Sequence, residues 1–289
     1  MLSLYDKDLD RDNCGFGLMA HMDGVPSHEL VRRSIQSLSR LTHRGAVAAD
    51  GKSGDGCGIL MKKPEDFLRA ICEEEGIQLG EHYAVGMVFL SQDDGLAARA
   101  RHRLETELMA EGLVTAGWRR VPVDASVCGN YALSILPRIE QIFINAESTL
   151  SNERFERHLY IARRRAKKNI KSNDSDFHVV TLSTQVLCYK GLVLPHNLPL
   201  FYTDLKDERL ASSLCIFHQR FSTNTWPEWR LAQPFRYLAH NGEINTIQGN
   251  RNWAQARSYK FDTDLIHNMD DIRPWVSMTG SDSYSLDNM

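Results

Sequence analysis

The sequence lacks the features that mark membrane proteins, secreted proteins and disulfide-bonded domains. No part of its 289 residues approaches the ~18 consecutive apolar residues of a membrane helix. The first residues, Met1–Asp8, have no apolar centre of the kind found in secretion signals. No two of the six cysteines form a Cys-x-x-Cys pair; they are Cys14, Cys57, Cys72, Cys128, Cys188 and Cys215. We therefore expect reduced thiols, a cytoplasmic location, and neither a zinc knuckle nor a disulfide framework.

Metal-ligand patterns and a strong charge of one sign are also missing. The eleven histidines include no His-Glu-x-x-His signature. His218, His240 and Glu243 could in principle converge on a metal, but histidines beside buried strands are usually satisfied by hydrogen bonds, so we predict no metal. A net charge of -3 with 42% hydrophobic and 25% charged residues is typical of an ordinary globular protein.

One short stretch is strongly basic, although the chain as a whole has a slight negative charge. Arg163-Arg164-Arg165 is followed by Lys167 and Lys168 within a predicted helix over residues 151–171. The stretch has no interleaved aromatic residues, and the whole chain is slightly acidic, so we favour a solvated helix face or a domain contact over nucleic-acid binding. No repeat or low-complexity linker marks a domain boundary.

Short apolar runs alternate with amphipathic stretches, which predicts a mixed α and β fold. Ser27 is a plausible cap for a helix that directs Leu30, Val31, Ile35, Leu38 and Leu41 to the core, and a second helix is expected near Pro64–Glu75. Short turns between several strands favour antiparallel pairing. The predicted strands are Gly15–His21, Cys57–Met61, Tyr83–Leu90, Tyr131–Leu136, Gln141–Ile144, Phe177–Leu182 and Leu187–Leu194.

Cys14 is the strongest candidate for a catalytic residue. It follows an acidic leader, residues 1–13, and opens the run Cys14-Gly15-Phe16-Gly17. If the leader is cleaved, Cys14 carries both a thiol and a free α-amine, so nucleophile and general base belong to one residue. The alternative is a buried structural cysteine, which is the commoner fate of a single free cysteine.

Further polar residues follow two more apolar runs, which we interpret as strands ending in polar loops. Arg220 comes after Cys215–Gln219 and has the fork geometry that grips a carboxylate, although a surface ion pair would use it equally. Asn241 and Gly242 follow Pro234–His240 and offer an amide and a backbone N–H to an oxyanion, unless they form a plain turn. Asp282 could bind an ammonium group or cap a helix.

These motifs together resemble the glutaminase domain of the large subunit of glutamate synthases, a class II glutamine amidotransferase. The resemblance covers nearly the whole chain. The motifs that carry it are Cys14-Gly15-Phe16-Gly17, His43-Arg44-Gly45, the stretches Phe217–Asn224 and Ala239–Asn245, and Gly280-Ser281-Asp282-Ser283, with support from Leu136–Phe143 and Trp253–Phe261.

The resemblance implies a fold and a role for each matching residue. The fold would be the N-terminal nucleophile hydrolase fold, an α+β four-layer α/β/β/α sandwich of two antiparallel sheets. Cys14 would form a γ-glutamyl thioester with glutamine and release ammonia. Arg220 would hold the α-carboxylate and Asp282 the α-ammonium, Asn241 and Gly242 would stabilise the oxyanion, and Arg44 would have a mainly positional role.

The resemblance also implies partners that lie outside this sequence. Residues 1–13 would be a propeptide and residues 14–289 an amidotransferase domain that is incomplete at its C-terminal end. In the whole enzyme, C-terminal synthase domains with FMN and an iron–sulfur cluster would convert 2-oxoglutarate to glutamate, and an electron-donating small subunit would be a further partner. Another class II amidotransferase, an N-terminal-nucleophile amidohydrolase and a catalytically silent glutamine-binding module stay open as alternatives.

Overall fold

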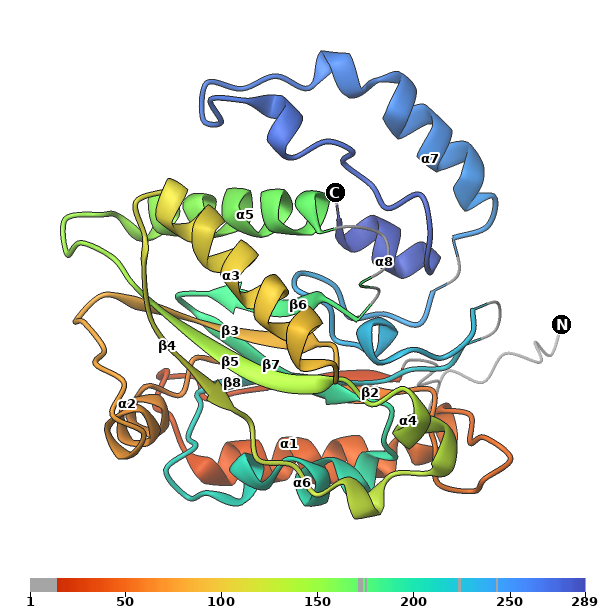
Figure 1. The fold of residues 1–289 in the computed structure, drawn as a ribbon. Coiled ribbons are helices and arrows are strands. Elements are labelled where there is room, and N and C mark those ends of the chain that lie inside the picture. Colours follow the sequence, from red (N-terminus) through yellow and green to blue (C-terminus); the bar gives the residue numbers. More distant parts are fainter. Residues whose placement is uncertain (1–14, 171–173, 175, 223–224, 243, 289) are drawn as a thin grey trace, which may run out of the picture.

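The computed structural model describes residues 15–170, 174, 176–222, 225–242 and 244–288. Two sheets lie face to face, and helices cover their outer sides (Figure 1). This arrangement confirms the predicted four-layer sandwich. The strands are β1 (Phe16–Ala20), β2 (Cys57–Lys62), β3 (Tyr83–Leu90), β4 (Val114–Arg120), β5 (Arg138–Asn145), β6 (His178–Ser183), β7 (Val186–Gly191) and β8 (Leu214–Gln219). The helices are α1 (His28–Arg40), α2 (Glu65–Glu74), α3 (Asp94–Ala110), α4 (Asn130–Ser134), α5 (Asn152–Asn169), α6 (Leu198–Phe201), α7 (Ile247–Ala256) and α8 (Asp282–Asp287).

Neighbouring strands in both sheets run antiparallel, as predicted. The first sheet has the order β1-β8-β2-β7 and the second has the order β4-β5-β3-β6. In the first sheet Phe16 lies opposite His218, and Cys57 lies opposite Gln219. The first residues of β1 and β2 therefore lie beside the last residues of β8, at the same end of the sheet.

Strand β3 explains how the layers hold together. All its residues are buried, and they alternate between two apolar clusters because successive side chains of a strand point to opposite faces. Val85, Met87 and Phe89 belong to the cluster that lies between the sheets and extends to α1 and α2. Ala84 and Val88 belong to the cluster under α3 and α5. Because β3 is buried on both faces, its sequence must be apolar at every position and not only at alternate ones.

The predicted first helix is confirmed together with its cap. The Ser27 hydroxyl accepts a hydrogen bond from the Leu30 backbone N–H at 3.2 Å, which satisfies one of the donors that a helix N-terminus leaves free. Val31, Ile35 and Leu38 are buried, while Leu30 and Leu41 pack at the edge of the core.

Two predicted strands are wrong. Residues 131–136 were expected to be extended, but α4 occupies this stretch. Its first turn is held by acceptors from a neighbouring loop, since Tyr131 N donates to Asp50 Oδ2 at 3.1 Å and Ala132 N donates to Ser53 Oγ at 3.1 Å. Residues 234–240 form irregular structure instead of a strand, where the backbone N–H of His240 donates to the Gln233 side chain.

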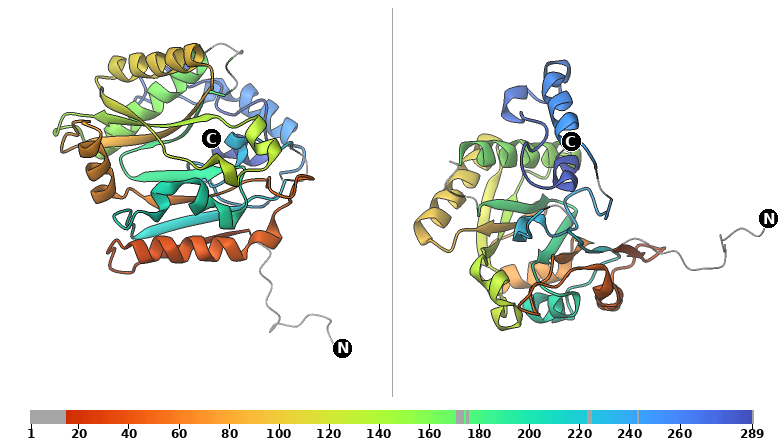
Figure 2. Two further views of the ribbon diagram at one scale, coloured as in Figure 1. Left: turned by 60° about the horizontal axis from the view of Figure 1, so that its bottom comes forward. Right: turned by 90° about the vertical axis from the view of Figure 1, so that its right-hand side faces the viewer.

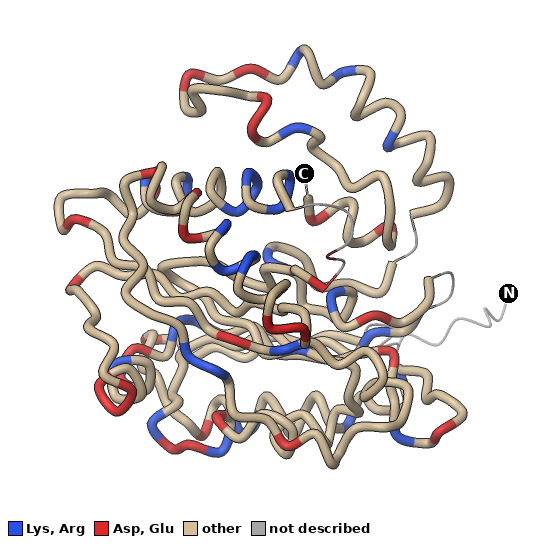
Figure 3. The backbone as a smooth tube through the Cα atoms, viewed as in Figure 1, with Lys and Arg blue, Asp and Glu red and all other residues tan. Residues whose placement is uncertain are grey.

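Residues 233–242 and 244–288, here called the C-terminal segment, extend from the sandwich beside α5 (Figure 2). Basic residues gather on α5 next to this segment (Figure 3). Arg165 Nη2 pairs with Asp271 at 2.6 Å, Lys168 Nζ donates to the Asp270 carbonyl at 2.8 Å, and Lys167 donates to the Tyr284 hydroxyl. The basic stretch therefore contacts the C-terminal segment, while Lys167 and Lys168 also remain exposed to solvent.

Within the described residues, no helix combines the length and apolar character needed to span a bilayer.

Candidate active site

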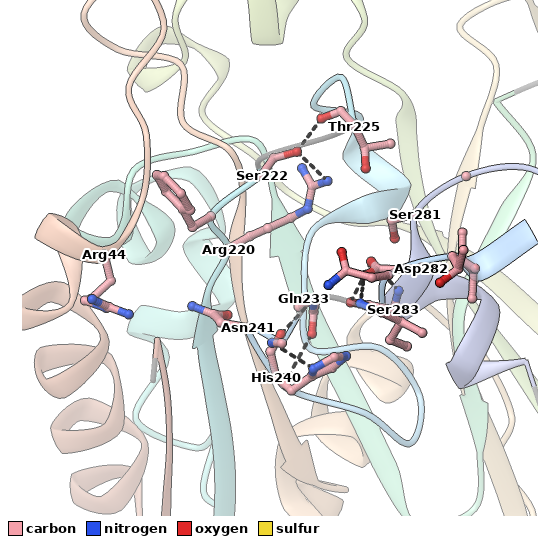
Figure 4. Close-up of a pocket in the computed structure, with 17 residues that line it drawn as sticks. Arg44, Arg220, Ser222, Thr225, Gln233, His240, Asn241, Ser281, Asp282 and Ser283 are labelled. Carbon is pink, nitrogen blue, oxygen red and sulfur yellow. Dashed lines mark hydrogen bonds between the residues drawn. The ribbon is translucent and has the colours of Figure 1, made fainter. Parts of the chain in front are cut away.

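A pocket of about 340 Å³ opens where the end of β8, the loop before α7 and the beginning of α8 come together (Figure 4). In Figure 4, Arg44 and Asn241 lie on one side, Asp282 and Ser283 on the other, and Arg220 between them. All predicted site residues that the structure describes line this pocket. Its lining consists of Arg44, Arg220, Phe221, Ser222, Thr225, Gln233, His240, Asn241, Gly242, Ile244, Asn245, Thr246, Ile247, Gly280, Ser281, Asp282 and Ser283.

Arg220 follows the last residue of β8 and is held by the turn that precedes β2. Its backbone N–H donates to the Gly56 carbonyl at 2.9 Å, and its Nη1 donates to the Asp55 carbonyl at 3.2 Å. Nη2 donates to Ser222 Oγ at 3.0 Å. Only 4% of Arg220 is exposed, so its guanidinium is a fixed cation at the pocket and not a surface ion-pair partner.

Asp55 lies beside Arg220 and is also buried. Its Oδ2 accepts a hydrogen bond from the Ser222 N–H at 2.7 Å. Burial raises the pKa of the Asp55 carboxyl, and the hydrogen bond from Ser222 and the charge of Arg220 oppose that shift. Burial likewise lowers the pKa of the Arg220 guanidinium, against the charges of Asp55 and Asp282. The two residues thus reduce each other's cost of burial.

Glycine is required next to Asp55. Gly56 has a φ of 110°, and a Cβ at this position would lie 2.8 Å from the Ala232 Cβ. An L side chain would be strained by both the backbone angle and the close contact. The Gly54-Asp55-Gly56 turn therefore brings its carbonyl groups and the Asp55 carboxylate close to Arg220.

Asn241 packs against the beginning of β1. A Cβ on Gly15 would lie 2.3 Å from Asn241 Nδ2, so only glycine permits this approach. With the amide oxygen turned towards Gly15, that oxygen accepts from the Gly15 N–H at 3.2 Å and the amide nitrogen donates to the His240 carbonyl at 3.2 Å. Cys14, which precedes Gly15 in the sequence, lies outside the described residues.

His240, the residue before Asn241, uses both its backbone N–H and its backbone carbonyl in hydrogen bonds. His240 N donates to Gln233 Oε1 at 3.1 Å, and the His240 carbonyl accepts from Gln233 Nε2 at 3.1 Å and from His218 Nε2 at 2.9 Å. The Gly242 N–H donates to His240 Nδ1 at 2.9 Å. Both predicted oxyanion donors are therefore occupied, the Asn241 amide nitrogen by the His240 carbonyl and the Gly242 N–H by His240 Nδ1, and each can serve an oxyanion only after its bond breaks.

Asp282 is the first residue of α8, but it does not cap that helix. Ser281 is the cap, since its Oγ accepts from the Tyr284 N–H at 3.1 Å. The Asp282 carboxylate instead accepts from the Ile244 N–H and the Ser283 N–H, each at 2.6 Å. It ties the loop to α8 and keeps lone pairs for a ligand in the pocket, because a carboxylate offers about four acceptor sites.

Arg44 reaches the pocket from the turn after α1. It ends a short 3₁₀ helix, Thr42–Arg44, and Gly45 follows. A Cβ on Gly45 would lie 1.7 Å from Gln219 Nε2, so this turn packs directly on the last residue of β8. The predicted positional role of Arg44 stays a prediction.

The possible metal site is not formed by the described residues, where no three His, Cys, Asp or Glu side chains are grouped to hold an ion. His218 Nε2 is used by the His240 carbonyl, and Glu243 lies outside the described residues. Burial lowers the pKa of His218 to about 4, so its imidazole is neutral at physiological pH.

Comparison with known proteins decides the family. The family model described as class-II glutamine amidotransferases matches residues 14–289. The chain belongs to this family. The match begins at Cys14, the residue that the sequence singles out as the nucleophile.

Among individual relatives, the class-II amidotransferase chain is similar to glutamate synthases. It is 40% identical to the glutamate synthase (NADPH) large chain of Bacillus subtilis over 287 residues and 43% identical to that of Azospirillum brasilense over 289 residues, covering 99% of this chain in each case. It is 39% identical to the ferredoxin-dependent glutamate synthase 1 of Arabidopsis thaliana over 96% of this chain. The chain spans about a fifth of the length of these relatives.

Several residues of this amidotransferase site were missed by the sequence analysis. Asp55 holds the segment around Arg220, and Gln233 and His240 hold the peptide before Asn241. A carboxylate between two glycines, just before a buried strand, was a usable signal for Asp55. Nothing in the sequence pairs Gln233 with His240, because their contact depends on the irregular path of the chain between them.

Proposed function

We propose that this chain hydrolyses glutamine to glutamate and ammonia with Cys14 as the nucleophile. The observation that carries the proposal is the pairing of charges in one pocket, where the Arg220 cation and the Asp282 carboxylate both contribute to the lining. An α-amino acid presents the complementary pair of charges. Asn241 lines the same pocket and contacts Gly15, the neighbour of Cys14 in the sequence.

The proposed reaction uses each of these groups once. The fork of Arg220 binds the α-carboxylate and Asp282 binds the α-ammonium, so the γ-amide is directed towards the nucleophile. The Cys14 thiolate attacks the γ-carbon, the α-amine of Cys14 passes the thiol proton to the leaving nitrogen, and ammonia departs as the thioester forms. Water then adds to the thioester, which releases glutamate and restores the thiol. The oxyanion of each step is stabilised by Asn241 Nδ2, once it is released from the His240 carbonyl and turned towards Cys14, and by the Gly242 N–H, once it is released from His240 Nδ1.

We further propose that residues 1–13 are a propeptide, that residues 14–289 form the amidotransferase domain, and that the reaction supplies ammonia for glutamate synthesis in a larger, cytoplasmic enzyme. The similarity to glutamate synthases supports this role. FMN and an iron–sulfur cluster would belong to other parts of such an enzyme. The described residues of this chain do not fit a cluster, because their five cysteines are buried separately and no group of metal ligands is formed.

Intact-protein mass spectrometry with a glutamine-mimicking diazoketone tests the nucleophile. We expect the purified chain to have lost residues 1–13 and to gain one adduct, which excess glutamine prevents. Cys14→Ala should give no adduct and no glutamine hydrolysis. Cys215→Ala is the matched control, since Cys215 is fully buried in β8 and should leave labelling intact.

A retained leader together with absent labelling would favour the silent glutamine-binding module, and normal hydrolysis by Cys14→Ala would refute the nucleophile. Arg220→Ala separates binding from chemistry. Loss of a buried, bidentate carboxylate contact should raise the KM for glutamine by ~10²-fold. An unchanged KM would remove Arg220 from the substrate site.

A further inference from the structure

Arg163 on α5 is a largely buried residue whose guanidinium has no carboxylate partner among the described residues. Only 8% of the residue is exposed. Among the residues that the structure describes, no carboxylate oxygen lies within 4.0 Å of its guanidinium nitrogens, and no hydrogen-bond acceptor meets them. Its guanidinium carbon lies 5.3 Å from the centre of the Tyr160 ring, a cation–π contact that leaves the N–H donors unused.

The neighbouring basic residues of α5 are all satisfied. Arg164 donates to the carbonyl groups of Ile272 and Pro274, and Arg165 pairs with Glu111 and Asp271. Lys167 and Lys168 also donate to the C-terminal segment. Unlike the other basic residues of this stretch, Arg163 therefore does not attach α5 to the C-terminal segment.

Arg163 lines a second pocket, separate from the candidate active site. Its volume is about 260 Å³, far more than the ~30 Å³ of one water molecule in the liquid. Tyr237 at the pocket is 82% exposed, so solvent reaches it. The lining consists of Glu156, Tyr160, Arg163, Thr181, Leu182, Ser183, Gln185, Val186, Arg236 and Tyr237.

The other charges around this pocket are already compensated. Arg236 Nη2 pairs with Asp287 at 2.8 Å. Glu156 Oε1 accepts from Ser183 Oγ at 2.8 Å and from the N–H and hydroxyl of Thr184 at 2.7 and 2.6 Å. The Arg163 charge is thus left without a counter-charge.

The Arg163 guanidinium is a charged group at the wall of this pocket. Burial and the charges of Arg236 and Arg164 lower the pKa of Arg163 to about 9, so the guanidinium still holds its proton at neutral pH. None of its nitrogens is among the buried atoms without a hydrogen-bond partner, so they face the solvent-filled pocket and can meet a ligand there. A planar guanidinium matches the two oxygens of a carboxylate or phosphate group.

We propose that this pocket binds a small oxyanion, a carboxylate or a phosphate group, through the guanidinium of Arg163. Gln185 and Tyr160 add polar groups to its walls. The proposal is independent of glutamine hydrolysis. The two pockets are linked along the chain, since Arg236 lies five residues before Asn241, and the N–H of Tyr237 donates to Asp287 at the end of α8.

Calorimetric titration and thermal unfolding of the chain test this site. The probes are inorganic phosphate, sulfate and malonate, each compared with chloride at equal ionic strength. We expect saturable binding and a matching rise in Tm, because a ligand that binds only the folded state stabilises it. Arg163→Met should weaken binding at least tenfold, yet its Tm without the probe anion should equal or exceed that of the wild type. Arg163→Lys, which keeps the charge but loses the fork, should retain weaker binding.

Arg165→Met is the matched control on the same helix. It should lose stability, because Asp271 loses its ion pair and Glu111 keeps only His158, but it should keep the wild-type anion affinity. Equal affinity in the wild type and Arg163→Met, or no saturable response in the wild type, would overturn the proposal. The same titration on the natural full-length polypeptide distinguishes a free anion, which still binds there, from a carboxylate side chain of that polypeptide, which blocks the pocket.

Discussion

The sandwich and the C-terminal segment are built in different ways. In the sandwich, two large clusters of apolar side chains fill the spaces between the sheets and under the helices. In the C-terminal segment, Phe235 and Tyr284 form a small cluster with Leu231, while Trp253, Tyr259 and Leu265 are exposed. Polar contacts from α5 attach the segment to the sandwich, and the hydrogen bonds of Asp282 join the loop before α7 to α8 within the segment.

The pocket lies between these two regions and takes residues from both. Arg220 and Arg44 come from the sandwich, whereas Asn241, Gly242 and Asp282 come from the segment. Stability should therefore depend mainly on the sandwich core. Ligand binding should depend on polar contacts across the junction, which contribute less to the free energy of unfolding.

The largest effect is expected from a core substitution. Phe143, in β5, is fully buried in the cluster between the sheets. Phe143→Ala should lower the free energy of unfolding by ~3–5 kcal/mol, since it removes a large buried side chain and leaves a cavity. Denaturant unfolding measures the loss. The KM for glutamine of the folded fraction should stay within twofold of the wild type.

Phe143→Leu is the control, because it preserves much of the volume and should cost far less than the alanine variant. A large change in KM with little loss of stability would show that the sandwich and the site are not separable as described.

A pH-dependent effect is expected at the junction itself. His218, in β8, is fully buried, and its Nε2 meets the His240 carbonyl at 2.9 Å. Burial lowers its pKa from 6.5 to about 4. Between these values the unfolded chain binds a proton that the folded chain excludes. Its contribution to stability is therefore complete above pH 6.5 and is lost as pH falls towards 4, a change on the order of 3 kcal/mol.

Unfolding measured at several pH values tests this expectation. His218→Gln should reduce the acid-induced loss, although some remains because burial also lowers the pKa of His178. His196→Gln, at an exposed histidine, is the control. Parallel loss of stability in His218→Gln and the wild type would exclude His218 as the responsible group.

The sequence predicted the sandwich better than the junction, for a physical reason. Runs such as Tyr83–Leu90 reveal a strand buried on both faces, and Ser27 marks a helix start, because both signals are local. Residues 131–136 were misjudged because Asp50 and Ser53, distant in sequence, hold the first turn of α4. Candidate site residues were found by their chemistry. Asp55 left a local signal between its two glycines, but the support that Gln233 gives to His240 acts through contacts that no local pattern encodes.

In free-energy terms, the smallest effect is expected from Asp282→Asn. This substitution also tests most directly whether the C-terminal segment serves ligand binding and the sandwich serves stability. The amide oxygen can keep one of the two backbone hydrogen bonds that the carboxylate accepts, but the negative charge is lost. If Asp282 binds the α-ammonium of glutamine, the KM should rise by ~10-fold, which corresponds to ~1.4 kcal/mol, while kcat and Tm change little.

Asp270→Asn is the matched control within the same segment, since Asp270 pairs with Arg273 away from the pocket. It should leave the KM for glutamine unchanged. An unchanged KM in Asp282→Asn would mean that the carboxylate only fastens the loop to α8. A loss of stability as large as that of Phe143→Ala would mean that the polar contacts within the segment stabilise the protein as much as the apolar core of the sandwich does.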